Sequence, residues 1–219
     1  MKLHLIWDMD GTLVNSEPEI LATIQRSMQE LGLSLEDSIQ PIKIGPPLPV
    51  VLRNSFSEDV LSDLLLEDVV KRFREIYDSS EFVDTQPFEG VDEIIKSDAY
   101  VHHVITNKPD YATRRIIEKK GWKHFFKDVL SPNTLIDVVG RQMKKPELFR
   151  YFKEKYPNLK VVGIGDMAGD AECANAVDFF SIGVLWGTGT KSELQQSGCR
   201  AIVSNAVELK TVLDNYYAY

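Results

Sequence analysis

The sequence has little that would place it in a membrane or in an oxidising compartment. It has only two cysteines, Cys173 and Cys199, which lie far apart and lack the close spacing of metal ligands. We expect them to be reduced thiols of a cytoplasmic protein. No apolar run approaches the roughly 18 residues that a membrane-spanning helix needs. The apolar run before Asp8 is also too short for a signal peptide, so the sequence predicts a soluble chain with no membrane partner.

The sequence also lacks a block of basic residues. It has 25 Lys and Arg against 33 Asp and Glu, which gives a formal net charge of -8. Non-specific binding of nucleic acid needs clustered Lys and Arg that face phosphates, so we expect no nucleic-acid partner. An acidic chain also repels an anionic substrate unless a metal ion or local cations reverse the sign. Any site for an anion must therefore carry its own positive charge.

The N-terminal part of the chain predicts one strand followed by a helical segment. Residues 3–7 form a short apolar run typical of a buried strand. Ser16 and Glu19 have the spacing of a capping box, and apolar residues then follow at helical intervals up to Gly32. A second helical pattern runs from about residue 58 to residue 77. Because no β pattern is evident between residues 15 and 83, we expect an all-helical insertion there.

The remainder of the chain, residues 84–219, alternates between strand and helix patterns. Helices are expected at 108–121, 145–156 and 169–177. Strands are expected at 100–106, 128–131, 159–165, 181–186 and 201–204. This alternation predicts an α/β fold, in which a parallel sheet carries helices on both faces.

Polar side chains follow several of the predicted strands at the point where each strand ends. In an open α/β sheet, ligands bind at the carboxyl ends of the strands, so these side chains are expected to share one rim. A lysine at the start of a predicted helix reaches the same rim, and the dipole of that helix favours an anion at its N-terminus. The residues of this set are Asp8, Asp10, Thr106, Asp166, Asp170 and Lys145.

Each member of the set also has an ordinary structural explanation. Asp8 and Asp10 suit a surface turn, and Asp166 and Asp170 suit the cap of a helix. Most lysines lie on the surface, and this remains our interpretation of Lys108 and Lys144. These separate explanations do not account for the arrival of all six residues at one edge of the sheet.

The chemistry that suits such a set is phosphoryl transfer. A hard divalent cation, Mg²⁺ first, takes oxygen ligands and relieves the repulsion between neighbouring carboxylates. One aspartate can attack phosphorus to form an aspartyl-phosphate, and a second carboxyl can move protons to and from the oxygens. Thr106 and Lys145 would hold the phosphoryl oxygens and neutralise the charge that develops on them.

Four segments of the sequence resemble, in order and spacing, the motifs of the haloacid dehalogenase-like hydrolase superfamily. They are "DMDGTL" (8–13), "ITN" (105–107), Lys145-Pro146 and "GDMAGD" (165–170). The resemblance implies a Rossmann-like catalytic core formed by residues 1–14 and 84–219. It also implies that residues 15–83 are an inserted cap domain, which acts as a movable lid that excludes water from the site.

The resemblance further implies a role for each matching residue. Asp8 would be the nucleophile, and Asp10 the acid and base that also offers its backbone carbonyl to Mg²⁺. Thr106 and Lys145 would bind phosphate, and Lys145 would also steady Asp8. The metal ligands would be Asp8, Asp10, Asp166 and Asp170, and Gly11 and Asn107 would offer donors to the phosphate.

The second aspartate separates the subclasses of the family. Dehalogenase members lack an acid at the place of Asp10, so the sequence favours a phosphatase or a phosphomutase. The segments "IGPPLPVVL", "PFEGVDEII" and "IGVLWGTGT" resemble the phosphoglycolate phosphatase group. Arg53, in the expected cap, could pair with a substrate carboxylate, although an exposed arginine on a helix face is at least as common.

We therefore expect a Mg²⁺-dependent phosphatase that acts on a small soluble phosphate ester, with phosphoglycolate as the first candidate. Other activities of the same superfamily remain open, namely sugar phosphomutase, pyrophosphatase and nucleotidase. A regulatory binding protein on a retired catalytic fold is the non-enzymatic alternative, and the presence of every reactive group speaks against it. The sequence is compatible with either a monomer or a homodimer.

Overall fold

The computed structural model describes residues 2–217. The chain divides into two compact units, one formed by Met1–Asn15 with Pro87–Tyr219 and the other by Ser16–Gln86. We call them the core unit and the helical unit. Within the described residues, no helix is both long and apolar enough to cross a membrane.

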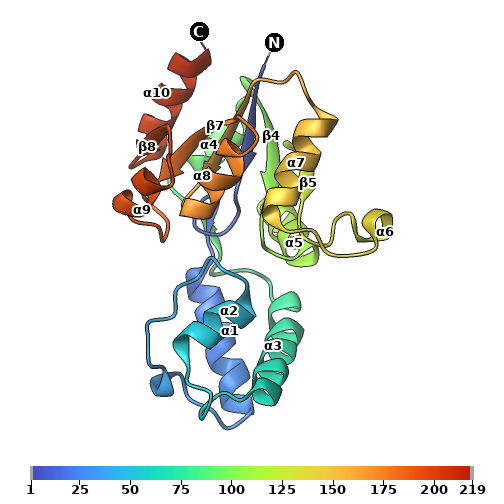
Figure 1. The fold of residues 1–219 in the computed structure, drawn as a ribbon, viewed down its shortest axis with the longest axis vertical. Helices are drawn as coiled ribbons and strands as arrows, with labels where there is room; N and C mark the ends of the chain where they lie inside the picture. Colours follow the sequence, from blue (N-terminus) through green and yellow to red (C-terminus); the bar gives the residue numbers. More distant parts are fainter. Residues whose placement is uncertain (1, 218–219) are drawn as a thin grey trace. The chain divides into compact units, whose positions relative to one another are not determined.

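The core unit is built on a six-stranded sheet with the order β5-β4-β1-β6-β7-β8 (Figure 1). Every neighbouring pair in this sheet is parallel. The carboxyl ends of all six strands therefore lie along the same edge. The strands are β1 (Leu3–Trp7), β4 (Tyr100–Ile105), β5 (Phe126–Leu130), β6 (Val161–Gly165), β7 (Phe180–Val184) and β8 (Ala201–Val203).

Helices cover both faces of this sheet, as the alternating pattern predicts. On one face, Ile6 of β1 packs in a cluster with Phe152 and Ala174, which belong to α7 and α8. The opposite face carries Trp7 and Tyr100, because successive side chains of a strand alternate between faces, and there Tyr100 Oη donates a hydrogen bond to Asp214 of α10 at 3.0 Å. The helices are α4 (Val91–Ile95), α5 (Asp110–Lys119), α6 (Ile136–Val139), α7 (Lys145–Lys155), α8 (Ala168–Asn175), α9 (Lys191–Gln196) and α10 (Ala206–Tyr217). The predicted α/β class with a parallel sheet is confirmed.

The helical unit contains three α-helices and one short 3-10 helix. Its core is partly aromatic, since the Phe73 and Tyr77 rings stack and Phe82 meets Tyr77 edge-on. The elements are α1 (Glu17–Glu30), η1 (Leu35–Asp37), α2 (Leu48–Ser55) and α3 (Asp63–Asp78). A second sheet has two strands, β2 (Val14–Asn15) and β3 (Gln86–Pro87).

Two local predictions in this region are wrong. The helix expected from about residue 58 begins only at Asp63, where the Ser62 hydroxyl accepts a hydrogen bond from Leu65 N–H. The capping box at the start of α1 does not form, because the Ser16 side chain makes no capping hydrogen bond. The Glu19 carboxylate instead accepts bonds from Thr85 N (3.1 Å), Thr85 Oγ1 (2.8 Å) and Ser80 Oγ (2.6 Å). A buried carboxylate needs several donors, and the segment that ends the helical unit supplies them.

Candidate active site

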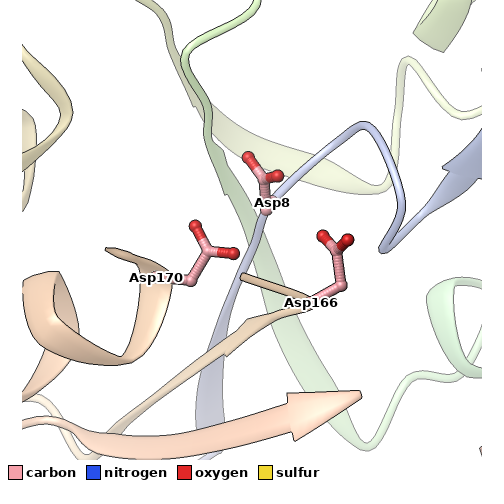
Figure 2. Close-up of side chains that lie close together, drawn as sticks. All are labelled: Asp8, Asp166 and Asp170. Atoms are coloured by element: carbon pink, nitrogen blue, oxygen red, sulfur yellow. The ribbon is translucent and has the colours of Figure 1, made fainter. Parts of the chain in front are cut away.

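Three carboxylates meet at the carboxyl edge of the core sheet. Asp8 is the first residue after β1, Asp166 is the first after β6, and Asp170 lies in the first turn of α8. One oxygen from each carboxylate lies within 4.8 Å of the others. Figure 2 shows the three carboxyl groups side by side. They come together because β1 and β6 are neighbouring parallel strands that end at the same level.

A buried lysine joins two of these carboxylates. Lys145, at the start of α7, places Nζ 2.6 Å from Asp8 Oδ1 and 2.5 Å from Asp170 Oδ1. Its side chain is 6% exposed, so both ion pairs lie largely out of solvent. Burial alone would lower the pKa of Lys145, but the attraction of Asp170 and Asp8 outweighs it and raises that pKa. The ammonium form of Lys145 is therefore favoured at neutral pH.

The crowding of negative charge also changes the carboxylates. Burial, followed by repulsion from Asp170 and Asp166, raises the pKa of Asp8 to about 7, although Lys145 opposes the shift. Burial and the neighbouring Asp170 likewise raise the pKa of Asp166. Burial and the repulsion between neighbouring carboxylates thus make the ionised forms of Asp8 and Asp166 unfavourable unless further positive charge is present. The carboxylate cluster therefore favours the binding of a cation.

Asp166 is held by donors from two loops. Thr12 Oγ1 donates to Oδ1 at 3.0 Å, while Thr188 donates to Oδ2 through N–H at 2.9 Å and through Oγ1 at 3.1 Å. The loop that carries Thr188 lies so close that a Cβ on Gly189 would stand 1.8 Å from the Asp166 carbonyl oxygen. Sequence reasoning missed both threonines. The available signal was that "GTGT" follows β7, and so lies at the same edge of the sheet.

Asp10 is paired with a lysine that we expected at the surface, so that expectation for Lys108 is wrong. Lys108 Nζ lies 2.9 Å from Asp10 Oδ1 and 3.2 Å from Oδ2. The Lys108 side chain is only 4% exposed, and that of Asp10 is 18% exposed. Because β4 lies beside β1, the loop after β4 brings this ammonium to the loop after β1. No short segment of the sequence reveals this pairing, because local patterns do not indicate which strands are neighbours in the sheet.

The remaining predicted residues of the core lie at the same edge. Thr106 is buried and is the first residue after β4, and its Oγ1 accepts a hydrogen bond from Lys108 N–H at 3.1 Å. Asn107 beside it is exposed. Gly11 has a φ of 78°, and a Cβ there would stand 2.3 Å from Asp166 Oδ2, so a side chain would displace that carboxylate. The Gly11 N–H donates to Val14 O at 3.0 Å.

Arg53 lies in the helical unit, on α2. Its Nη1 donates to Leu61 O at 2.5 Å, and its Nη2 forms an ion pair with Asp63. These bonds hold the guanidinium against the segment that precedes α3. Its contact with a substrate stays a prediction.

The donor set fits a hard divalent cation. Asp8, Asp166 and Asp170 present carboxylate oxygens, which are the ligands that Mg²⁺ prefers over nitrogen or sulfur. When ionised, the three carboxylates carry three negative charges, and Lys145 neutralises one of them. A divalent cation would balance the remaining two. The charge, the donor type and the raised carboxyl pKa values thus agree.

Curated relatives match nearly the whole chain at modest identity. A phosphoglycolate phosphatase from Xanthomonas campestris is 26% identical over 191 residues, which cover 84% of this chain and 83% of that protein. A phosphoglycolate phosphatase from Haemophilus influenzae is 23% identical, with 94% and 96% of the two chains covered. A 5'-nucleotidase from Pseudomonas aeruginosa is also 23% identical, with 97% and 96% covered.

Solved structures share the fold. A predicted phosphatase from Clostridium acetobutylicum superposes with a TM-score of 0.79 at 23% identity, covering 98% of this chain and 99% of that chain. A haloacid dehalogenase-like family hydrolase from Streptococcus pneumoniae also gives 0.79, at 20% identity, with 95% and 97% covered. The model of the haloacid dehalogenase-like hydrolases matches residues 5–184, a span that contains all four motifs and the carboxylates described above. The chain therefore belongs to the haloacid dehalogenase-like hydrolase family.

Proposed function

We propose that this protein is a Mg²⁺-dependent phosphatase that hydrolyses a small phosphomonoester through an aspartyl-phosphate on Asp8. Membership of the family, together with its phosphatase relatives, makes the chain a phosphoric monoester hydrolase. The observation that supports the finer proposal is the state of Asp8. Its carboxylate is bound by the Lys145 ammonium, lies beside two further carboxylates, and has a second aspartate two residues later in the chain.

In the first step, an Asp8 carboxylate oxygen attacks the substrate phosphorus. The bond between phosphorus and the ester oxygen breaks, and that oxygen leaves with the electron pair. Asp10, acting as the acid, gives its proton to the leaving oxygen, so that a neutral alcohol departs. Asp8 is left as a mixed anhydride with phosphate.

In the second step, water attacks the phosphorus of the aspartyl-phosphate. Asp10, now a carboxylate, takes a proton from this water, and the bond between phosphorus and the Asp8 oxygen breaks. Inorganic phosphate leaves, Asp8 returns as a carboxylate, and Asp10 is again an acid. The net reaction consumes one water and releases one alcohol and one phosphate.

The other residues hold the phosphoryl group and its charge. Lys145 both orients Asp8 and neutralises charge on the equatorial oxygens, and the Thr106 hydroxyl donates to one of them. Asp8, Asp166 and Asp170 would hold Mg²⁺ together with the Asp10 carbonyl oxygen. When bound, the metal polarises the phosphoryl group and offsets the repulsion between Asp8 and the incoming anion.

Phosphoglycolate is the first candidate substrate, and a nucleoside monophosphate is the second. Phosphoglycolate phosphatases from Xanthomonas campestris and Haemophilus influenzae support the first. The 5'-nucleotidase from Pseudomonas aeruginosa, which matches over 96% of its length, supports the second. The substrate is thus expected to be a small phosphate ester rather than a macromolecule.

The test is phosphate release from a panel that contains phosphoglycolate, nucleoside monophosphates, sugar phosphates and pyrophosphate. Each compound is assayed with Mg²⁺, with chelator, and with the Asp8→Asn variant. Release that requires Mg²⁺ and is abolished in Asp8→Asn supports the proposal, and the ranking of kcat/KM identifies the substrate. Isomerised sugar phosphate without free phosphate would indicate a mutase. No turnover of any compound by folded protein would refute the proposal.

A further inference from the structure

Lys108 is a buried cation that the proposed reaction does not use. Its side chain is 4% exposed, and its ammonium lies 2.9 Å and 3.2 Å from the two oxygens of Asp10. Burial of an ammonium without a partner costs much free energy, so the Asp10 carboxylate is what makes the burial of Lys108 tolerable. The proposed nucleophile Asp8 has a lysine of its own in Lys145. The two aspartates after β1 are therefore held by two different ammonium groups.

The geometry of the contact fixes the orientation of the Asp10 carboxyl group. One Nζ within reach of both oxygens restrains the rotation of the carboxyl plane as well as its position. The backbone of Lys108 is also restrained, since its N–H donates to Thr106 Oγ1 at 3.1 Å and its carbonyl oxygen accepts from Thr113 Oγ1 at 3.3 Å. The backbone of Lys108 is thus anchored to the residue that follows β4 and to α5, while its side chain reaches to the loop after β1.

We propose that Lys108 is a positioning residue for proton transfer, which fixes the orientation of the Asp10 carboxyl group, so that one carboxyl oxygen protonates the leaving oxygen while the other stays paired with the ammonium. This inference rests on the proposed function, in which Asp10 is the acid. Proton transfer needs the carboxyl oxygen within hydrogen-bond reach of the leaving oxygen, and a misplacement of about 1 Å can cost on the order of 100-fold in rate. The same residue orients Thr106, because the N–H of Lys108 occupies a lone pair of that hydroxyl and leaves its proton to be donated elsewhere.

The leaving group provides the test. An alkoxide is a poor leaving group and needs a proton from Asp10, whereas 4-nitrophenolate leaves without one. In Lys108→Met, we expect kcat/KM to fall on the order of 100-fold for an alkyl phosphate and less than about threefold for 4-nitrophenyl phosphate. The exposed Lys123 supplies the matched control, since Lys123→Met removes a lysine of the same unit and should leave both rates unchanged.

A double-mutant cycle separates an action through Asp10 from a direct contact with substrate. If Lys108 acts through Asp10, then adding Lys108→Met to Asp10→Asn should change the alkyl rate by less than about twofold, because coupled residues are not additive. The double variant also removes both charges, so that neither is left buried alone. Lys108→Arg keeps a cation beside Asp10 and should recover most of the alkyl rate.

Two kinds of result, one kinetic and one crystallographic, would overturn the inference. One is an equal loss for both leaving groups, or an undiminished loss in the Asp10→Asn background, which would place Lys108 on the transferring phosphoryl group itself. The other is a crystal structure of Lys108→Met in which the Asp10 carboxyl group keeps its wild-type orientation. The crystallographic result is independent of turnover, so it tests whether Lys108 orients Asp10 even if the wild-type protein hydrolyses no ester and the proposed function fails.

Discussion

A buried histidine on β4 makes the stability of the core unit depend on pH. His102 is 2% exposed, and its Nδ1 accepts a hydrogen bond from Trp7 Nε1 at 3.1 Å. An indole N–H can only donate, so Nδ1 must remain an acceptor and the imidazole must remain neutral. Burial accordingly lowers the pKa of His102 from 6.5 to about 4. Protonation below this value would charge the ring and break the bond from Trp7.

The sign of the effect follows from the direction of the shift. The pKa of His102 is lower in the folded state than in the unfolded state, so its neutral form stabilises the fold above pH 6.5. That contribution is lost as the pH falls from 6.5 toward 4. Linkage with these two values gives a loss of about 2 kcal/mol between pH 7 and pH 5. Solvent does not screen the effect appreciably, because the ring is almost fully buried.

The measurement compares the wild-type protein with His102→Gln, since glutamine offers Trp7 an acceptor that does not titrate. Urea denaturation at pH 7 and pH 5 can be followed by tryptophan fluorescence, because Trp7, Trp122 and Trp186 all belong to the core unit. We expect the wild type to lose about 2 kcal/mol more than His102→Gln between the two pH values. His124 is exposed, so His124→Gln is the matched control and should follow the wild type. Equal losses in wild type and His102→Gln would refute the reasoning.

Three further substitutions test the site and the core. Lys145→Met leaves Asp8 without its ammonium, and we expect phosphate release to fall about 100- to 1,000-fold in steady-state kinetics; a variant with more than a third of the wild-type rate would contradict the assigned role. Gly189→Ala places a Cβ 1.8 Å from the Asp166 carbonyl oxygen, and should lower the free energy of unfolding by about 1–3 kcal/mol in urea denaturation. An unchanged urea midpoint would contradict this prediction, because it would mean that the loop carrying Gly189 moves to accommodate the Cβ at little cost in free energy. Phe152→Ala removes a side chain that is 0% exposed and should lower the free energy of unfolding by about 3–5 kcal/mol in the same assay. A decrease below about 1 kcal/mol would contradict the core role of Phe152.

Much of the architecture could be predicted because its signals are local. The apolar run at 3–7, the strand and helix alternation after residue 84 and the position of polar residues at strand ends can all be read within short windows. Parallel strands then bring these ends to one edge, and the structure indeed gathers Asp8, Asp166 and Asp170 there. The predicted capping box at Ser16 was wrong because the deciding contacts are not local: the Glu19 carboxylate accepts hydrogen bonds from residues more than 60 positions away.

Local sequence patterns predict the class of fold, the alternation of its elements and most of the residues at the carboxyl edge of the sheet. How those residues pair depends on the folded chain. Lys108 and Lys145 are both lysines near the start of a helix, and nothing local distinguishes their partners. Their partners depend on which strands are neighbours: β4 lies beside β1, so Lys108 meets Asp10, while α7 brings Lys145 between Asp8 and Asp170. Pairings of this kind depend on sheet order, which is set by the packing of the whole chain rather than by any short segment.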